Sequence, residues 1–129
     1  MASQNVTSRM TGAIAAATLA GLQYHFVKET ATGIAACATL GGMIHGVLED
    51  DDATAINMPC AVATGGQIKV EAGAANAGVI SVGDLVSTDA TGHAMTSITK
   101  YFFYGVCVGA SSAAGECATL QIGPTGYVP

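Results

Sequence analysis

The sequence predicts an all-β fold: a small β-barrel or β-sandwich of short antiparallel strands, built from two similar β-units with an extended N-terminal arm. Short apolar or alternating runs recur between glycine-rich turns at even spacing, which is typical of barrels and sandwiches. No stretch carries signals strong enough to require a helix. The chain also resembles itself, because residues 26–66 are similar to residues 85–123 and Phe26-Val27 aligns with Leu85-Val86 at an offset of 59 residues.

The composition indicates one domain with a thin core. We expect residues 1–22 to form the N-terminal arm and a first weak strand, and residues 23–129 to form a single β domain. Half of the residues are apolar, yet Trp is absent and only three are Phe. At about 25 cal/mol per Å² of buried apolar area, so few large side chains leave a monomer marginally stable. An oligomer or a docked subunit would bury more area.

The charge content excludes some classes of partner. Only 10% of the residues are charged and the formal net charge is −5, whereas a nucleic-acid binder clusters its Lys and Arg residues. No run approaches the roughly 18 apolar residues of a membrane span, and residues 12–22 lack the basic flank of a signal peptide. We therefore expect a soluble protein that binds neither nucleic acid nor a membrane and carries no export signal.

The first unit follows an arm. Residues 1–10 are polar and without periodicity. The alanines of residues 12–22 would suit a helix, but an extended segment is favoured because no clear cap begins a helix there and glycines flank it. Residues 24–30 form the first predicted strand. The turn at residues 31–33 follows, where Gly supplies a positive φ. Residues 33–38 are the returning strand of the hairpin.

The middle of the chain holds two further predicted strands. Residues 43–48 form a short apolar strand that ends in an acidic loop. Alternation then places on one face Ile56, Met58, Cys60 and Val62, and Pro59 within that run marks an edge or a bulge. Gly65-Gly66 is expected to turn the chain into a half-buried strand at residues 67–72, whose inward side chains are Ile68, Val70 and Ala72.

The second unit repeats the first after a small-residue linker at residues 73–78. Residues 84–88, a turn at residues 90–92 and residues 93–98 form the second predicted hairpin. Residues 101–108 form an aromatic and β-branched strand. Residues 116–122 alternate, with the inward side chains Ala118, Leu120 and Ile122, and we expect the tail at residues 124–129 to be irregular.

The sequence offers no catalytic, cofactor-binding or metal-binding motif. The three histidines, His25, His45 and His93, are isolated in the sequence and are expected to be partly exposed strand residues. The pattern GxSxG of a nucleophile elbow is absent, and the paired glycines lack the Lys of a phosphate-binding loop. In residues 81–94, Asp84, Asp89 and His93 do not recur at the offset of 59, so we interpret this stretch as scaffold. We expect no enzyme activity.

Structural roles are favoured for the cysteines and for the acidic loop. The four cysteines lack CxxC spacing, and buried free thiols are favoured over disulfides; they are Cys37, Cys60, Cys107 and Cys117. The acidic loop comprises Glu49, Asp50, Asp51 and Asp52. It could bind Ca²⁺, although it does not match an EF-hand. A solvated loop that deters edge-to-edge pairing is favoured, and a docking contact to a basic partner is the third interpretation.

Four segments between residues 24 and 123 carry a family resemblance: FVKETATGIA, GGMIHGVLEDD, GGQIKVEAGA and ISVGDLVSTDATGHA. The sequence resembles the small head-decoration, or capsid cement, proteins of tailed bacteriophages. The resemblance implies a β-rich, non-enzymatic virion protein, made in the host cytoplasm, that binds the major capsid protein on the head exterior. It also implies a homotrimer and offers no catalytic residue to transfer.

The arm is the predicted capsid contact. A polar terminal segment would order on binding by adding a strand or a clamp to a capsid edge, and a frayed terminus is the alternative. The predicted contact residues are Asn5, Val6, Thr7, Ser8, Arg9 and Met10.

Two other functions compete with this interpretation. A β-sandwich module of a phage fibre or tail that recognises a host-surface glycan would expose aromatic side chains, which cluster only at residues 101–104. An enzyme fragment would need paired carboxylates, a metal-ligand cluster or an activated nucleophile, and the sequence shows none of these patterns.

Overall fold

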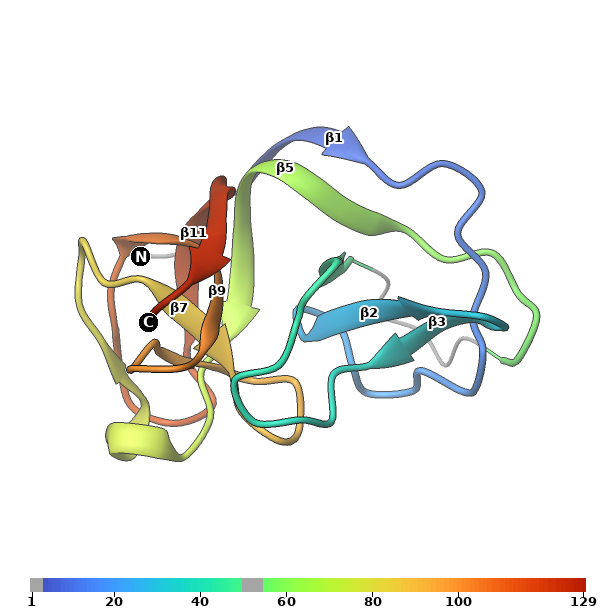
Figure 1. Ribbon diagram of the computed structural model, residues 1–129. Helices are drawn as coiled ribbons and strands as arrows, with labels where there is room; N and C mark the ends of the chain where they lie inside the picture. The colour runs from blue at the N-terminus through green and yellow to red at the C-terminus, as the bar shows by residue number, and fades with distance from the viewer. Residues whose placement is uncertain (1–3, 50–54) are drawn as a thin grey trace.

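A computed structural model describes residues 4–49 and 55–129 (Figure 1). The described residues form short strands, one 3₁₀ turn at Ala75–Gly78 and no α-helix. The strands are β1 (Asn5–Arg9), β2 (Phe26–Thr30), β3 (Gly33–Ala36), β4 (Gly46–Leu48), β5 (Val62–Glu71), β6 (Val79–Ile80), β7 (Val86–Thr88), β8 (Ala94–Thr96), β9 (Phe102–Gly109), β10 (Ser111–Ser112) and β11 (Cys117–Tyr127).

The strands form antiparallel sheets, as the sequence predicts. One sheet has the order β3-β2-β4-β5-β11-β9, with β1 also paired to β5, while β7-β8 and β6-β10 are two-stranded. The sheets do not close into a barrel, and their arrangement is that of an open sandwich. In Figure 1 the curved β5 runs from the half of the molecule that holds β2 and β3 to the half that holds β7, β9 and β11.

Strand β5 joins the two halves because it pairs with a different strand at each end. Its first residues pair with β4, where Val62 lies opposite Leu48, and its last residues pair with β11, where Glu71 lies opposite Cys117. Strand β1 pairs with the other edge of β5, since Ala63 pairs with Val47 of β4 on one side and with Arg9 of β1 on the other. The long strand β5 therefore connects the two units through its pairing.

The predicted turn at Gly65-Gly66 is wrong, because both glycines lie inside β5. Gly66 has a φ of +89°, and the β1 register shifts at the same point. A positive φ in one strand bends a ladder instead of reversing the chain. A Cβ on Gly66 would lie 2.6 Å from the Thr7 amide nitrogen and would also meet the Asn5 carbonyl oxygen, so β1 and the bend depend on Gly.

The two similar units share their backbone connections. In each unit a hairpin strand pairs with the following strand, and the same contacts recur 59 residues later. The hydrogen bond from Tyr24 N to Leu48 O matches the one from Gly83 N to Cys107 O. The hydrogen bond from His25 N to Leu22 O matches the one from Asp84 N to Ser81 O. The pairing of Phe26 with Val47 matches the pairing of Leu85 with Val106. Their loops differ: Thr30 pairs with Gly33, whereas Thr88 pairs with Ala94.

Two buried clusters form the core. The larger includes residues of both units, among them Phe26, Val47, Val86 and Leu120, while the smaller includes Ala13, Ala15 and Leu19. The predicted inward residues are buried, with at most 2% exposure; they are Ile68, Val70, Ala72, Ala118, Leu120 and Ile122. Residues 12–22 form no helix and cross the smaller cluster through isolated bridges.

Two predicted details of the strands are wrong. Ile56 and Met58 are 61% and 54% exposed, because Asn57 between them has a φ of +66° and interrupts the alternation. The tail is not irregular from residue 124, since β11 continues to Tyr127 by pairing with Phe102. A register shift between Gln121 and Thr125 accommodates Pro124, which cannot donate to the ladder.

Candidate functional site

The predicted capsid-contact segment already forms a strand. Its members Asn5, Thr7, Ser8 and Arg9 are exposed, whereas Val6 and Met10 pack against the two core clusters. Within the described part of the chain β1 pairs with β5 alone, so its outer edge is the one that strand addition would use. The arm is therefore part of the sheet before any partner binds.

The acidic loop is described only at Glu49, because Asp50, Asp51 and Asp52 lie outside the described residues. Arg9 donates to Glu49 through Nε at 2.8 Å and through Nη2 at 3.1 Å. The hydrogen bond and the negative charge of Glu49 both raise the pKa of the Arg9 guanidinium. The two predicted site segments are thus joined to each other, and Glu49 is engaged by β1.

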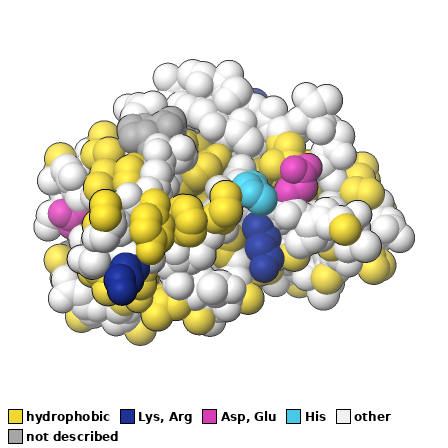
Figure 2. Space-filling view, viewed as in Figure 1, with side chains coloured by type: hydrophobic (Ala, Val, Ile, Leu, Met, Phe, Trp, Pro, Cys, Tyr) yellow, Lys and Arg dark blue, Asp and Glu magenta, His cyan; other side chains and the backbone are white. Residues whose placement is uncertain are grey.

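Hydrophobic side chains are exposed at one end of β9 and β11. Met43 is 58% exposed and Tyr127 is 48% exposed. The Tyr127 ring lies 4.9 Å from the Phe102 ring, centroid to centroid. We call Met43, Phe102, Phe103 and Tyr127 the apolar surface. Figure 2 shows hydrophobic side chains gathered across the left and centre of the molecule in this view.

The apolar surface borders two shallow hollows that meet at Met43. One, of about 270 Å³, is lined mainly by Phe102, Phe103 and Tyr104, and the other, of about 230 Å³, is lined by residues that include Lys28 and His45. Their shape is suited to receiving side chains of a partner more than to enclosing a small molecule.

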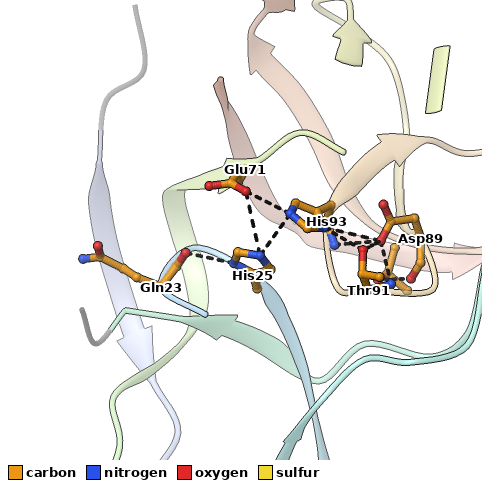
Figure 3. Close-up of polar contacts among 7 residues, drawn as sticks. Gln23, His25, Glu71, Asp89, Thr91 and His93 are labelled. Atoms are coloured by element: carbon orange, nitrogen blue, oxygen red, sulfur yellow. Dashed lines mark hydrogen bonds and ion pairs between the residues drawn. The ribbon is translucent and has the colours of Figure 1, made fainter. Parts of the chain in front are cut away.

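The expectation that the histidines are partly exposed strand residues is wrong, because His25, His45 and His93 each lie one residue before a strand and His25 is buried. Two of them also meet in space. His25 precedes β2 and is 5% exposed, and its Nε2 lies 3.1 Å from His93 Nε2. Glu71, the last residue of β5, places Oε2 at 2.9 Å from His93 Nε2 and at 3.9 Å from His25 Nε2. Figure 3 shows the three side chains pointing toward one another. His45 lies apart, where its Nδ1 accepts from the Glu29 amide at 2.7 Å.

The loop between β7 and β8 positions His93. The Asp89 Oδ1 atom accepts from Thr91 N, Thr91 Oγ1 and His93 N at 2.8–2.9 Å, which fixes a compact turn. The loop docks on β2 because Phe26 N donates to Gly92 O at 2.7 Å. The loop also packs against Gly73, just after β5, where a Cβ would lie 2.8 Å from the His93 Cβ and would also meet Asp89 Oδ2.

Sequence reasoning missed this cluster because its members are far apart in the chain. His25 and His93 are separated by 68 positions, and the internal alignment sets neither against the other. One signal was available: the alternation of residues 67–72 puts Glu71 on the outward face at the end of a strand. That signal gives a position but no partner.

No disulfide joins the cysteines of the described residues. Burial raises the pKa of Cys37, Cys107 and Cys117, for Cys37 to about 12. A thiol that holds its proton is a poor nucleophile and a poor metal ligand, which agrees with a packing role.

The chain matches no family model, no curated protein and no solved structure. Among the residues that the structure describes, no helix is long and apolar enough to cross a membrane.

Proposed function

We propose that this protein is a structural component of a tailed-phage virion, a decoration or cement protein that binds the major capsid protein on the head exterior. The apolar surface carries the proposal. Met43 and Tyr127 expose large hydrophobic groups, and the partly buried Phe102 lines one of the two shallow hollows. Contiguous apolar area of this kind on a small chain marks a site of protein association.

The rest of the exposed side chains support association over catalysis. Further large hydrophobic residues at the surface are Ile14, Leu40, Ile56, Met58, Val79, Val82, Ile98 and Val108. Only 10% of the residues are charged, so little charge must be desolvated when such a surface is covered. In this proposal the protein has no enzymatic activity. It is made in the host cytoplasm and acts by binding to the exterior of the head.

Stabilisation of the head follows from mass action. A ligand that binds only the assembled, expanded shell lowers the free energy of that state by RT ln(1 + L/Kd) for each site, a term that grows with the ligand concentration L. A homotrimer increases the effect, because one subunit that is bound holds its two neighbours at high local concentration. We expect sedimentation equilibrium of the purified protein to give the mass of three 12.7 kDa chains, and a strict monomer at every concentration would contradict the trimer.

The experiment compares binding of three purified chains to expanded, undecorated heads by co-sedimentation. The wild type binds to saturation. Met43→Glu places a charge in the apolar surface and lowers the affinity at least about tenfold. Val82→Glu is the matched control, since Val82 is 66% exposed and lines neither hollow, and it binds like the wild type. Failure of the wild type to bind contradicts the function, and equal binding by Met43→Glu contradicts the assigned surface.

A second candidate, a fibre or tail module that binds a host glycan, is favoured by one observation. The exposed Tyr127 ring leans against Phe102 at an interplanar angle of 56°, and aromatic faces of this kind stack on sugars. Retention of the chain by immobilised host-surface glycans, together with no binding to heads, would replace the first proposal with this one.

A further inference from the structure

We propose that His25, Glu71 and His93 form a binding site for a divalent transition-metal ion, with Zn²⁺ as the ion that fits best. The Nε2 atoms of the two histidines and a Glu71 carboxylate oxygen lie within 4.8 Å of one another (Figure 3). This set lies apart from the apolar surface, and the inference does not rest on the proposed function.

The partners of His25 direct its lone pair into the site. His25 Nδ1 lies 3.0 Å from the Gln23 carbonyl oxygen. A carbonyl oxygen can only accept, so Nδ1 carries the hydrogen and donates it. In the neutral ring Nε2 is then the unprotonated nitrogen, and Nε2 faces His93 and Glu71. The tautomer assigned in this way is the one that binds a metal through Nε2.

The partners of His93 give the same result by a different route. The Thr91 hydroxyl donates to Asp89 Oδ1 at 2.8 Å, so it has no second hydrogen to offer. His93 Nδ1, at 2.7 Å from the Thr91 oxygen, must donate to it. Its Nε2 is therefore also unprotonated in the neutral ring. A metal-binding histidine commonly has its other nitrogen held by such a chain that ends in a carboxylate.

The spacing of the three ligand atoms suits a small ion. Zn²⁺ binds nitrogen and oxygen ligands at about 2.0–2.2 Å in a tetrahedral arrangement, which sets neighbouring ligand atoms about 3.3 Å apart. The three separations here are 2.9, 3.1 and 3.9 Å. They bracket the tetrahedral value, and closing the longest needs only a small movement of the Glu71 side chain.

When both rings are neutral, three acceptor atoms face one another, and a bound cation would relieve their repulsion. Two lone pairs and a carboxylate oxygen at these distances repel unless a proton or a metal ion is shared among them. The His25 side chain is 6% exposed, so water reaches it poorly, whereas those of His93 and Glu71 are 25% and 35% exposed. The opening on that side gives an ion a path to the site and leaves room for a water as fourth ligand.

The ligand types select the class of ion. Two imidazoles and one carboxylate suit Zn²⁺ and other late first-row metals, while Ca²⁺ and Mg²⁺ prefer oxygen ligands alone. Cys117 lies opposite Glu71 in the strand register, but the ligand cluster does not include it. The proposed coordination is therefore by nitrogen and oxygen, without sulfur.

The consequence of binding is mechanical. His25 and Glu71 belong to the first unit and its strand β5, and His93 belongs to the hairpin loop of the second unit. An ion held by all three would link the units across the core, where the backbone contact from Phe26 to Gly92 already joins them. Binding to the folded state alone raises its stability according to the ion concentration relative to the dissociation constant.

The test uses the full chain, free of any affinity tag and treated with a chelator, titrated with Zn²⁺ by calorimetry and melted with and without the ion. We expect one Zn²⁺ ion to bind per chain and to raise the melting temperature of the protein. Co²⁺ in place of Zn²⁺ gives the visible absorption of a four- or five-coordinate site, without thiolate charge-transfer bands.

Three variants locate the site. His93→Asn removes Nε2 while an amide nitrogen remains near the Nδ1 position, and Glu71→Gln removes the charge at constant size; each lowers the Zn²⁺ affinity at least about tenfold and abolishes the rise in melting temperature. His45→Asn is the control, because Asn can still accept from the Glu29 amide, and it binds Zn²⁺ like the wild type.

Four outcomes overturn the proposal: no heat with Zn²⁺ at 1:1 or higher ratios, thiolate bands in the Co²⁺ spectrum, an equal loss of binding in His45→Asn, or full binding in both site variants. Circular dichroism of the metal-free proteins shows whether each variant folds. If His93→Asn does not fold, the result with the more exposed Glu71→Gln decides.

Discussion

Cys37 shows at the scale of a single residue how the thin core sets a pH limit on stability. It is 3% exposed, and burial raises the pKa of its thiol to about 12, although the charge of Lys28 partly opposes the rise. In the unfolded chain a thiol has a pKa of about 8.5. Between these values the folded state keeps a proton that the unfolded state has lost.

The stability should therefore fall as the pH rises above the unfolded pKa. Below about pH 8.5 both states hold the proton and Cys37 adds no pH dependence, while from there to about pH 12 the free energy of unfolding decreases by up to about 1.4 kcal/mol per pH unit. Urea unfolding of the wild type and of Cys37→Ala at several values of pH measures this. A difference between the two proteins that stays constant from pH 8 to pH 11 would contradict it.

The meeting of His25 and His93 could not be predicted from the sequence, although the position of Glu71 could. The alternation of residues 67–72 predicts that Glu71 faces outward, and the structure agrees. What the sequence could not supply is the docking of the hairpin loop on β2 at Gly92, and the packing of the same loop against Gly73, where a Cβ would meet Asp89 and His93. The burial of His25 follows from the same contact. A pairing across 68 positions has no local signal.

Strand β5 is the element on which the arrangement of both units depends. Its alternation is local, so the inward side of residues 67–72 is predictable from the sequence. Its bend is not, because Gly65-Gly66 has the composition of a turn and only the neighbouring strands keep it extended. The same reason explains the tail, where pairing of Tyr127 with Phe102 extends a strand past Pro124.

Gly66→Ala tests this dependence. The left-handed φ of +89° costs a residue with a Cβ about 1–2 kcal/mol, and the Cβ would also meet the backbone of β1. We expect the free energy of unfolding measured with urea to fall by about 1–3 kcal/mol, and the amide hydrogens of β1 to exchange faster. Gly115→Ala is the control, since its φ is +87° but no atom lies within 4 Å of the added Cβ; it should lose less and leave β1 protected. Equal losses would contradict the account.

Strand β1 has two roles in the account, so removing it has two effects. It covers an edge of β5, packs Val6 against the core and holds Glu49 through Arg9. Deleting residues 2–10 should lower the free energy of unfolding, because that edge and the Val6 contact are lost, and should lower occupancy on heads.

A point variant separates these effects. Thr7→Glu changes an exposed side chain of β1 and should reduce head binding at nearly unchanged stability. If the deletion variant occupies heads as fully as the wild type, β1 is a structural strand and not a contact.

At the scale of the whole molecule, the fold class was predictable and the outline of the two units was as well. Short alternating runs with glycine turns define antiparallel strands locally, and the offset of 59 residues reappears in the hydrogen bonds of both units. The choice of an open sandwich over a barrel was not predictable, because closure depends on pairing between sheet edges that carry no local mark. The apolar surface likewise forms only when β9, β11 and residue 43 come together.

The central claim is that this surface binds a phage head and stabilises it. The most direct measurement is the melting temperature of expanded, undecorated heads, recorded by scanning calorimetry with increasing amounts of the purified chain. We expect the melting temperature to rise with the concentration of the chain, and Met43→Glu to give a smaller rise at the same concentration. A melting temperature that is unchanged at saturating protein would contradict the account.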